Sequence, residues 1–300
     1  MNRLRADLLL LLTAFIWGTA FIAQKDANQS MGPVSFVGAR FLLSALALIP
    51  LVIYETRRQT VALSRDDWIQ AGFVGLCLFA GASLQQLGLV TTTATNGGFL
   101  TALYVVIVPF MLWGVTRQRP RALVLAACGV SLCGAWLLTD DGEARHWSFG
   151  DLLVVLADFA WAIAIVLIGL FQQRTHRPFF LSFMQYAITA VLGLAAGLLF
   201  EPVSMPGLGS AMPAILYAGL LSGGVAYTLQ IVAQKHTPPA EAALIMSLES
   251  VFAALAGAVM LGDRLTLPAA LGCALILLGV VLVEAGPGLL RGLKLRFGMG

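Results

Sequence analysis

The chain contains few charged residues and few of the residue types on which most enzymes depend. Asp, Glu, Lys and Arg make up 11% of its 300 residues, whereas soluble domains contain about 25%. Hydrophobic residues make up 59%, so too little polar surface is available to cover a soluble globule. This composition excludes a soluble domain, a disordered chain and a secreted scaffold held together by disulfides.

Motifs of catalysis and cofactor binding are also missing. The sequence has no GxxxxGK[ST] loop, which excludes an ATPase of that type, and no CxxC pair for zinc or redox chemistry. Its three His residues, His146, His176 and His236, fall between the apolar runs, which argues against haem ligation or a Ser/His dyad within the membrane. We therefore expect a protein that is not an enzyme, with no catalytic residues, metal, cofactor or nucleic-acid partner.

Long apolar runs, by contrast, are abundant. A helix needs about 20 residues to cross a bilayer, and charges and Pro/Gly clusters divide the chain into ten such runs. They cover residues 7–24, 33–54, 67–90, 96–116, 121–139, 150–172, 178–200, 213–234, 240–261 and 268–286. Because the runs are long and do not alternate between apolar and polar residues, they predict helices rather than barrel strands. The expected fold is an all-α membrane protein with ten transmembrane helices in a lipid bilayer.

The basic residues predict how these helices are oriented. With the N-terminus in the cytoplasm, 14 of the 18 Lys and Arg residues lie in cytoplasmic segments, and Lys25, Arg145 and Arg264 lie outside. The remaining one, Arg40, lies within the second run. Because cytoplasmic loops are enriched in Lys and Arg, both termini are expected to be cytoplasmic, in a bacterial-type inner membrane.

The chain also resembles itself. Shifting it by 145 residues without gaps superimposes Pro33 on Pro178, Ala45 on Ala190, Gln85 on Gln230, Thr92 on Thr237, Cys128 on Cys273 and Gly134 on Gly279. The first helices align at an offset of 144, which places Trp17 over Trp161. Because each copy has an odd number of helices, the second copy is inverted in the membrane. We expect two inverted five-helix repeats, 1–145 and 146–290, followed by a basic cytoplasmic tail, 291–300.

Four segments resemble a known family. They are FIWGTAF at 15–21, VGARF at 37–41, GLVTTTATNGGFLTALYVV at 88–106 and AEAALIMSLESVFAALAGAVMLGDRLT at 240–266. With the inverted repeat, they make the chain similar to EamA-type members of the drug/metabolite transporter superfamily, and most similar to the YddG-type amino-acid exporters. The resemblance implies a secondary transporter that works by alternating access around a central cavity.

Charged side chains inside the apolar runs are candidates for function, because they are costly in a membrane. Arg40 has the planar fork that suits a substrate carboxylate, although a structural counter-ion or a side chain reaching the outer surface is an alternative. Asp158 and Glu249 could contact a substrate amine or carry a proton, or each could be a buried hydrogen-bond partner. They are the only acids expected well inside the runs.

Aromatic and amide side chains complete the expected cavity. An unpaired amide facing lipid is unfavourable, so the repeat-equivalent Gln85 and Gln230 are expected to face the interior. The predicted lining is Trp17, Phe79, Gln85, Phe99, Tyr104, Trp161, Tyr186, Tyr227 and Gln230. Core packing is the alternative for each aromatic.

Pro and Gly residues inside the runs suggest places where helices bend. Pro109 removes a backbone donor and should kink the fourth helix. The pairs Gly97-Gly98 and Gly223-Gly224 permit either close helix packing or flexibility for gating.

The most specific function that these observations favour is export of small metabolites, with neutral or aromatic amino acids first. A multidrug or other metabolite carrier, an intramembrane enzyme and a purely structural or assembly subunit are the alternatives. Transport down the substrate's own gradient and proton antiport both remain open, because antiport requires a titratable group such as Asp158 or Glu249.

Overall fold

The computed structural model describes residues 1–59, 61–138, 148–202, 204–260 and 266–297, with side chains as far as Val283. All its regular elements in these ranges are helices. The first half contains α1 (Arg3–Ala27), α2 (Pro33–Arg58), α3 (Arg65–Thr91), α4 (Ala94–Thr101), α5 (Tyr104–Thr116) and α6 (Ala122–Leu138). The second half contains α7 (Phe149–Thr175), α8 (Pro178–Phe200), α9 (Met205–Leu216), the π-helix η1 (Tyr217–Tyr227), α10 (Thr228–Ala233), α11 (Pro239–Met246), α12 (Glu249–Met260) and α13 (Leu267–Phe297).

These helices form the ten expected spans. Eight segments of the described chain are long and apolar enough to cross a membrane: α1, α2, α3, α7, α8, Ala94–Thr116, Met205–Ala233 and Pro239–Met260. Two shorter apolar helices, Ala122–Leu138 and Leu267–Val283, supply the other two. Three spans are not the uniform α-helices that the runs suggested, since two are interrupted and one contains η1. The expected boundary at 145 and the loop residues Arg145 and Arg264 lie outside the described residues.

Residues at the helix ends explain where several helices begin. Ser64 and Ser148 each accept a hydrogen bond from the backbone of an Asp three residues later, and that Asp bonds back to the Ser backbone. These capping boxes satisfy amides that have no partner inside the helix. Pro33 and Pro178 start α2 and α8, a position where a missing amide costs nothing.

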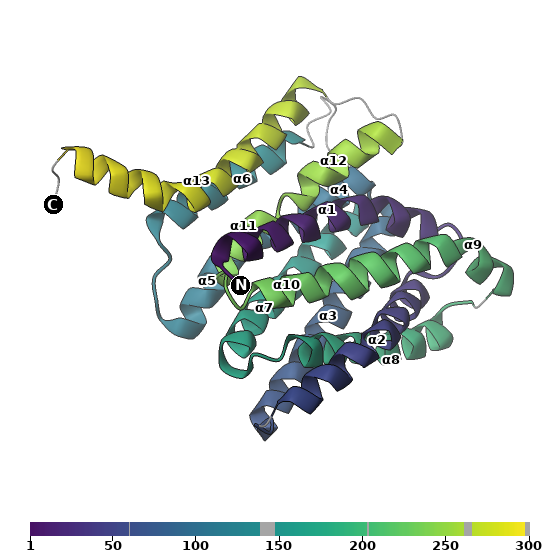
Figure 1. Cartoon of the computed structure of the whole chain (residues 1–300). Helices are drawn as coiled ribbons and strands as arrows, with labels where there is room; N and C mark the ends of the chain where they lie inside the picture. Colours follow the sequence, from purple (N-terminus) through teal and green to yellow (C-terminus); the bar gives the residue numbers. More distant parts are fainter. Residues whose placement is uncertain (60, 139–147, 203, 261–265, 298–300) are drawn as a thin grey trace.

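Helix pairs that join the two halves dominate the packing. The pair α2 and α8 lies along one edge of the bundle and the pair α6 and α13 along another, with α1 between them (Figure 1). A Cβ atom on Gly38 would lie 2.4 Å from the backbone of Leu194, and one on Gly197 would lie 2.9 Å from the Cα atom of Ser35. The start of α2 therefore lies against the end of α8, so the two helices are antiparallel.

Two glutamates cap these helices reciprocally. The Glu201 carboxylate accepts hydrogen bonds from the amides of Val34 and the residue after it, at 2.9 and 2.7 Å. The Glu55 carboxylate accepts them from the amides of Phe179 and its successor, at 3.1 and 2.8 Å. The capped amides are equivalent at the offset of 145, so each half caps the second helix of the other.

A second reciprocal contact joins each first helix to the opposite half. The Thr92 hydroxyl donates to Asp151 at 2.5 Å, and the Thr237 hydroxyl donates to Asp7 at 2.7 Å. The two Thr residues differ by 145 positions and the two Asp residues by 144. This recurrence shows that the halves pack as two inverted repeats about a pseudo-twofold axis.

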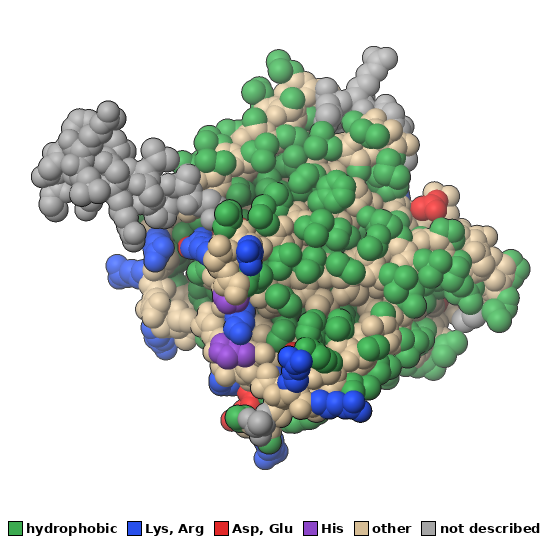
Figure 2. Space-filling model, in the orientation of Figure 1, with side chains coloured by type: hydrophobic (Ala, Val, Ile, Leu, Met, Phe, Trp, Pro, Cys, Tyr) green, Lys and Arg blue, Asp and Glu red, His purple; other side chains and the backbone are tan. Residues whose placement is uncertain are grey.

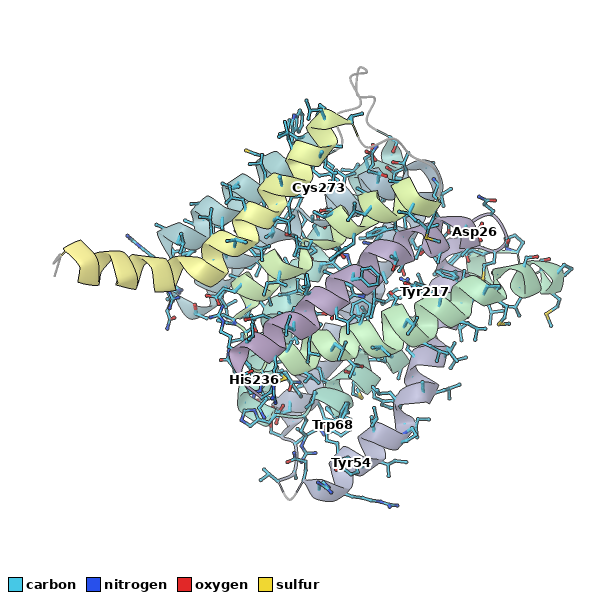
Figure 3. All side chains as sticks on the ribbon, turned by 45° about the horizontal axis from the view of Figure 1, so that its top comes forward. Asp26, Tyr54, Trp68, Tyr217, His236 and Cys273 are labelled. Atoms are coloured by element: carbon cyan, nitrogen blue, oxygen red, sulfur yellow. The ribbon has the colours of Figure 1, made fainter. Side chains whose placement is uncertain are left out.

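The outer surface matches a membrane environment. Hydrophobic side chains cover most of the visible face, and Lys and Arg gather along the end where α1 begins (Figure 2). Asp26 and Tyr217 lie toward the other end of the molecule from His236 (Figure 3). Desolvation lowers the pKa of His236, and the positive charges of the N-terminus and Lys235 lower it further. Both effects favour the neutral form of the His236 imidazole.

Candidate functional site

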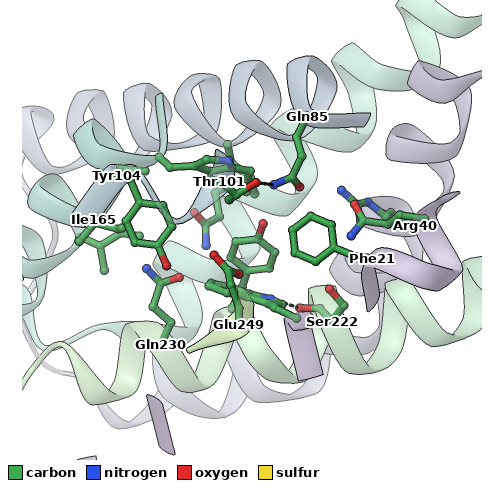
Figure 4. Close-up of a pocket in the computed structure, with 17 residues that line it drawn as sticks. Phe21, Arg40, Gln85, Thr101, Tyr104, Ile165, Ser222, Gln230 and Glu249 are labelled. Carbon is green, nitrogen blue, oxygen red and sulfur yellow. Dashed lines mark hydrogen bonds between the residues drawn. The ribbon is translucent and has the colours of Figure 1, made fainter. Parts of the chain in front are cut away.

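A cavity lies between the two halves, close to the middle of the spans (Figure 4). Its walls come from α1, α2, α3, α4, α5, α7, α8, η1, α10 and α12. The lining residues are Trp17, Phe21, Gln24, Arg40, Leu78, Gln85, Thr101, Tyr104, Trp161, Ala164, Ile165, Ile168, Gln185, Ser222, Tyr227, Gln230 and Glu249. Its volume is about 40 Å³, which holds only a few water molecules. The structure therefore represents a narrow form of the site.

Most of the residues that the sequence suggested for the lining are brought together here. Trp17, Gln85, Tyr104, Trp161, Tyr227 and Gln230 line the cavity, and so do the charged residues Arg40 and Glu249. Asp158 is fully buried on α7 but does not line it.

Three of the suggested aromatics do not reach the cavity. Phe79 is half-buried, and its neighbour Leu78 lines the cavity instead. Phe99 packs in a hydrophobic cluster with Ala14 and Leu248. Tyr186 lies behind the cavity wall, where its hydroxyl is 3.0 Å from that of Thr228. These positions differ from the expectation because successive side chains along a helix point in directions about 100° apart. Neighbouring residues therefore face different sides of the helix, and only some of them face the cavity.

Tyr227 stands at the centre of an aromatic cluster. Its ring centroid lies 4.5 Å from that of Trp17, 6.0 Å from that of Trp161 and 5.8 Å from that of Phe41. Trp161 packs directly on Gly81, where a Cβ atom would lie 2.9 Å from the indole ring. Two Trp residues at equivalent positions of the two halves therefore both pack against Tyr227.

The two Trp residues differ in their hydrogen bonds. Trp17 Nε1 donates to the Ser222 carbonyl at 3.2 Å, which fixes its ring (Figure 4). Trp161 Nε1 is buried and has no hydrogen-bond partner. Trp161 therefore offers a free donor to a ligand in the cavity.

Arg40 provides positive charge at the cavity. Its guanidinium donates to Gln24 Oε1 at 2.9 Å and lies over the rings of Phe36 and Phe41, at 5.4 and 5.0 Å from the centroids. Its Nε atom has no partner, and no described residue forms an ion pair with it. A buried guanidinium without a paired anion is unfavourable, so this site suits an anionic group of a ligand.

Amide side chains form the polar part of the walls. Gln85 donates to the Thr101 hydroxyl at 2.8 Å, and Gln230 donates to Gln234 Oε1 at 3.2 Å. Gln185 is buried, and its Nε2 atom has no partner. The sequence analysis did not single out Gln185, although it is the equivalent of Arg40 at the offset of 145.

Two carboxyl groups in and beside the cavity have oxygens without a hydrogen-bond partner. They are both oxygens of Asp158 and the Oε1 atom of Glu249. The Glu249 carboxylate interacts with the Tyr104 hydroxyl beside it and acts electrostatically on Asp158. Glu249 lines the cavity and suits a substrate ammonium group.

The two interrupted spans meet near these groups. One interruption separates α4 from α5 at Ala102 and Leu103, and the other separates α11 from α12 at Ser247 and Leu248. They are equivalent at the offset of 145. Pro109 lies inside α5, which continues through it, so the interruption precedes the proline that was expected to bend this span.

The candidate gating glycines lie at close helix contacts. A Cβ atom on Gly97 would lie 2.6 Å from Leu89, and one on Gly98 would lie 3.1 Å from Ala253. Gly223 faces Ser44 Oγ, which a Cβ atom would approach to 2.2 Å, and Gly224 faces a carbonyl of its own helix at 3.2 Å. Both of the latter lie in η1, the π-helix that ends at Tyr227, and π-helical turns are frequent at functional sites.

The fold and the cavity define a ten-helix membrane protein with a site enclosed between two inverted halves, an architecture of many secondary transporters. Comparison with known proteins specifies the family. The model of the EamA-like transporter family matches the chain twice, over residues 4–140 and 148–285. The chain belongs to this family, within the drug/metabolite transporter superfamily, and is a membrane transporter.

Individual relatives agree with this assignment. The chain is 30% identical to an "Uncharacterized transporter" of Archaeoglobus fulgidus, over 95% of this chain and 87% of the relative. It is 26% identical to the "Threonine/homoserine exporter RhtA" of Escherichia coli strain K12, over 86% of this chain and 84% of that protein. A solved crystal structure with 19% identity shares the fold with a TM-score of 0.76, covering 93% of this chain and 97% of the other.

Proposed function

We propose that this chain exports small zwitterionic metabolites, amino acids first among them, across a bacterial-type inner membrane. The observation that carries the proposal is that Arg40 and Glu249, two buried groups of opposite charge, line one cavity without pairing with each other. The similarity to a threonine/homoserine exporter favours the same substrate class.

The two charged groups of a zwitterion are complementary to Arg40 and Glu249 in the cavity. Its carboxylate would bind the Arg40 fork in a bidentate manner, and its ammonium group would bind Glu249. The ring of Phe21 lies between these residues in the view of Figure 4 and would contact the substrate's Cα region. The Trp161 indole and the amide of Gln185 have unused donors for further contacts.

Alternating access would follow from the inverted halves. Two similar halves of opposite orientation can exchange conformations and thereby open the central cavity to either side in turn. Both termini are placed in the cytoplasm in this proposal, in agreement with the basic residues that gather where α1 begins. Transport would follow the substrate's own gradient.

Flux into liposomes that contain only this protein tests the proposal. We expect saturable uptake of radiolabelled threonine, or of another neutral amino acid in a panel, without a pH gradient and with a protonophore present. Arg40→Gln should reduce flux at least about tenfold, because it removes a charge-assisted contact of about 1.5–3 kcal/mol. Arg40→Lys, which keeps the charge without the fork, should retain intermediate flux. Absence of flux for every amino acid would contradict the proposed substrate class.

The aromatic walls also suit a second candidate, a carrier of apolar cations. Trp17, Trp161 and Tyr227 could stack on a cationic drug, with Glu249 as its counter-ion. Such a substrate would need Glu249 but not Arg40. Efflux that survives Arg40→Gln and is lost in Glu249→Gln would therefore favour the multidrug carrier over the amino-acid exporter.

A further inference from the structure

Gln185 places an unused hydrogen-bond donor in the wall of the cavity. Its side chain lines the cavity and is only 1% exposed, and its Nε2 atom has no partner among the described residues. Two other amides of the same wall are paired, since Gln85 donates to Thr101 and Gln230 donates to Gln234. A buried N–H group without an acceptor is unfavourable, so the amide of Gln185 suits an acceptor that a ligand brings.

The internal repeat explains why Gln185 lacks a protein partner. Gln185 is the equivalent of Arg40 at the offset of 145, and Arg40 donates to Gln24 at 2.9 Å. The equivalent of Gln24, at the offset of 144 that aligns the first helices, is Ile168. Ile168 also lines the cavity but has no polar side-chain atom. The second half therefore keeps a donor where the first half has a donor and its acceptor.

Contacts with α3 fix the place of Gln185 in the cavity. A Cβ atom on Gly75 would lie 3.3 Å from the Cα atom of Gln185, and one on Gly81 would lie 2.9 Å from the Trp161 indole. Leu78, halfway between these glycines, lines the cavity. Positions three residues apart share one helix face, and six residues of helix span about 9 Å. Gln185 and Trp161 therefore flank Leu78 on one wall.

Arg40 and Gln185 lie toward opposite ends of the cavity. Each is the eighth residue of its helix, Arg40 in α2 and Gln185 in α8, and these two helices are antiparallel. A ligand whose carboxylate binds Arg40 therefore extends its other end toward Gln185. A neutral amide suits a neutral acceptor there, because a carboxylate is better matched by the guanidinium fork.

We propose that Gln185 is a specificity-determining residue whose amide N–H donates to an uncharged oxygen on the side chain of the substrate. This proposal rests on the proposed function, in which Arg40 and Glu249 bind the carboxylate and the ammonium group. The preferred substrates are amino acids whose side chain carries a hydroxyl, ether or carbonyl oxygen. A wholly apolar side chain of the same length leaves the buried N–H unpaired in the occupied site and binds more weakly.

Three amino acids with side chains of equal length test the proposal. Norvaline is wholly apolar, O-methylserine has an oxygen at the γ position and homoserine has one at the δ position. Binding of each to the purified wild type in detergent is measured by isothermal titration calorimetry. At least one oxygen-containing ligand should have a Kd about fivefold or more below that of norvaline, the effect of about one hydrogen bond. Equal Kd values for all three, or binding of none, would overturn the proposal.

Gln185→Met removes the amide while keeping the length of the side chain. The Kd ratio between norvaline and the preferred ligand should then fall to about one, because the donor is lost. If Gln185→Met does not fold, Gln185→Leu tests the same loss. A wild-type ratio in the folded variant would overturn the proposal, as would loss of the preference in Trp161→Phe while it persists in Gln185→Met.

Gln172→Met is the matched control. Gln172 is fully buried, and its Nε2 and Oε1 atoms also have no partner in the described chain, but it does not line the cavity. The control should keep the wild-type ratio, and its loss there would contradict a direct contact at Gln185.

Binding and liposome flux are separate measurements, so the two proposals can fail separately. Discrimination by Gln185 in a protein that shows no flux would contradict amino-acid export and support the role of Gln185. Flux of threonine together with equal Kd values for the three ligands would support export and overturn the role of Gln185.

Discussion

Trp17 and Trp161 are equivalent in sequence but have different roles at the cavity. The Trp17 indole is held by the Ser222 carbonyl at 3.2 Å, whereas the Trp161 indole N–H has no partner. Replacing Trp17 removes a hydrogen bond to the backbone of η1, whereas replacing Trp161 removes an unpaired donor from the cavity wall. The repeat therefore supplies two aromatic walls, of which one is structural and the other is available for binding.

Substitution of Trp161 tests this distinction. Trp161→Ala should raise the KM for the transported substrate about tenfold, because the contact of an aromatic ring is worth on the order of 1 kcal/mol beyond its buried area. Trp161→Phe should keep the stacking but lose the N–H donor, and give a smaller increase. The measurement is the initial rate of liposome uptake as a function of substrate concentration.

Trp113→Ala is the matched control, because Trp113 is 40% exposed on α5 and does not line the cavity. Its KM should equal that of the wild type. An unchanged KM in Trp161→Ala would rule out an aromatic contact with substrate at this position.

At the scale of helices, α6 and α13 meet through glycines. A Cβ atom on Gly134 would lie 2.6 Å from the Gly272 carbonyl oxygen, and one on Gly272 would lie 2.4 Å from the Gly134 carbonyl oxygen. Small residues let helix backbones approach closely in membranes, where packing rather than the hydrophobic effect drives association.

Gly272→Leu should therefore destabilise the folded protein. Overpacking of this kind costs about 1–3 kcal/mol, so the Tm in detergent should fall measurably in a thermal unfolding assay. Gly129→Leu, also on α6, provides the comparison, because a Cβ atom there meets nothing within 4 Å. Equal Tm values for the two variants would show that the α6–α13 contact does not depend on these glycines.

At the scale of the whole molecule, the reciprocal Thr–Asp contacts lie at opposite ends of the helix bundle. Thr237 bonds to Asp7 at the end where α1 begins, and Thr92 bonds to Asp151 at the other. Both contacts are present together with a cavity of about 40 Å³, so each is suited to hold one end closed while the other opens.

Breaking one contact should favour opening at that end. In a variant carrying Ser222→Cys, whose side chain lines the cavity, Thr237→Val should increase labelling by a membrane-impermeant thiol reagent from the cytoplasmic side. Thr92→Val should increase labelling from the periplasmic side. If both changes increased labelling from the same side, the two contacts could not be gates of opposite ends.

The orientation of the molecule is a separate prediction. In a background where Cys77, Cys128, Cys133 and Cys273 are replaced by Ala, a Cys at position 294 should react only from the cytoplasmic side. Gln29→Cys, in the exposed connection between α1 and α2, should react from the periplasm. Labelling of position 294 from the periplasm would contradict the placement of both termini in the cytoplasm.

Composition and internal similarity were sufficient to predict the architecture. Ten long apolar runs can satisfy their backbone hydrogen bonds in a bilayer only as helices. The internal repeat found in the sequence is matched in the structure by pairs of equivalent contacts, such as Thr92–Asp151 and Thr237–Asp7. Arg40 and Glu249 could be identified as candidate site residues because a charged side chain inside a membrane is energetically costly and is usually functional. These inferences depend only on how residues partition between water and membrane and on their spacing along the chain, and both can be determined from the sequence.

The details of the site depended on contacts between distant helices. Leu78 rather than Phe79 faces the cavity, because the rotation of a helix about its axis is set by the neighbours against which it packs. The interruptions at Ala102 and Ser247 and the π-helix η1 lie where helices of the two halves pack against each other, such as α4 against α12 and α2 against η1. Asp158 and Glu249 lie 91 positions apart in the sequence, and the action of one on the other depends on the tertiary structure, in which α7 and α12 both pack against α4.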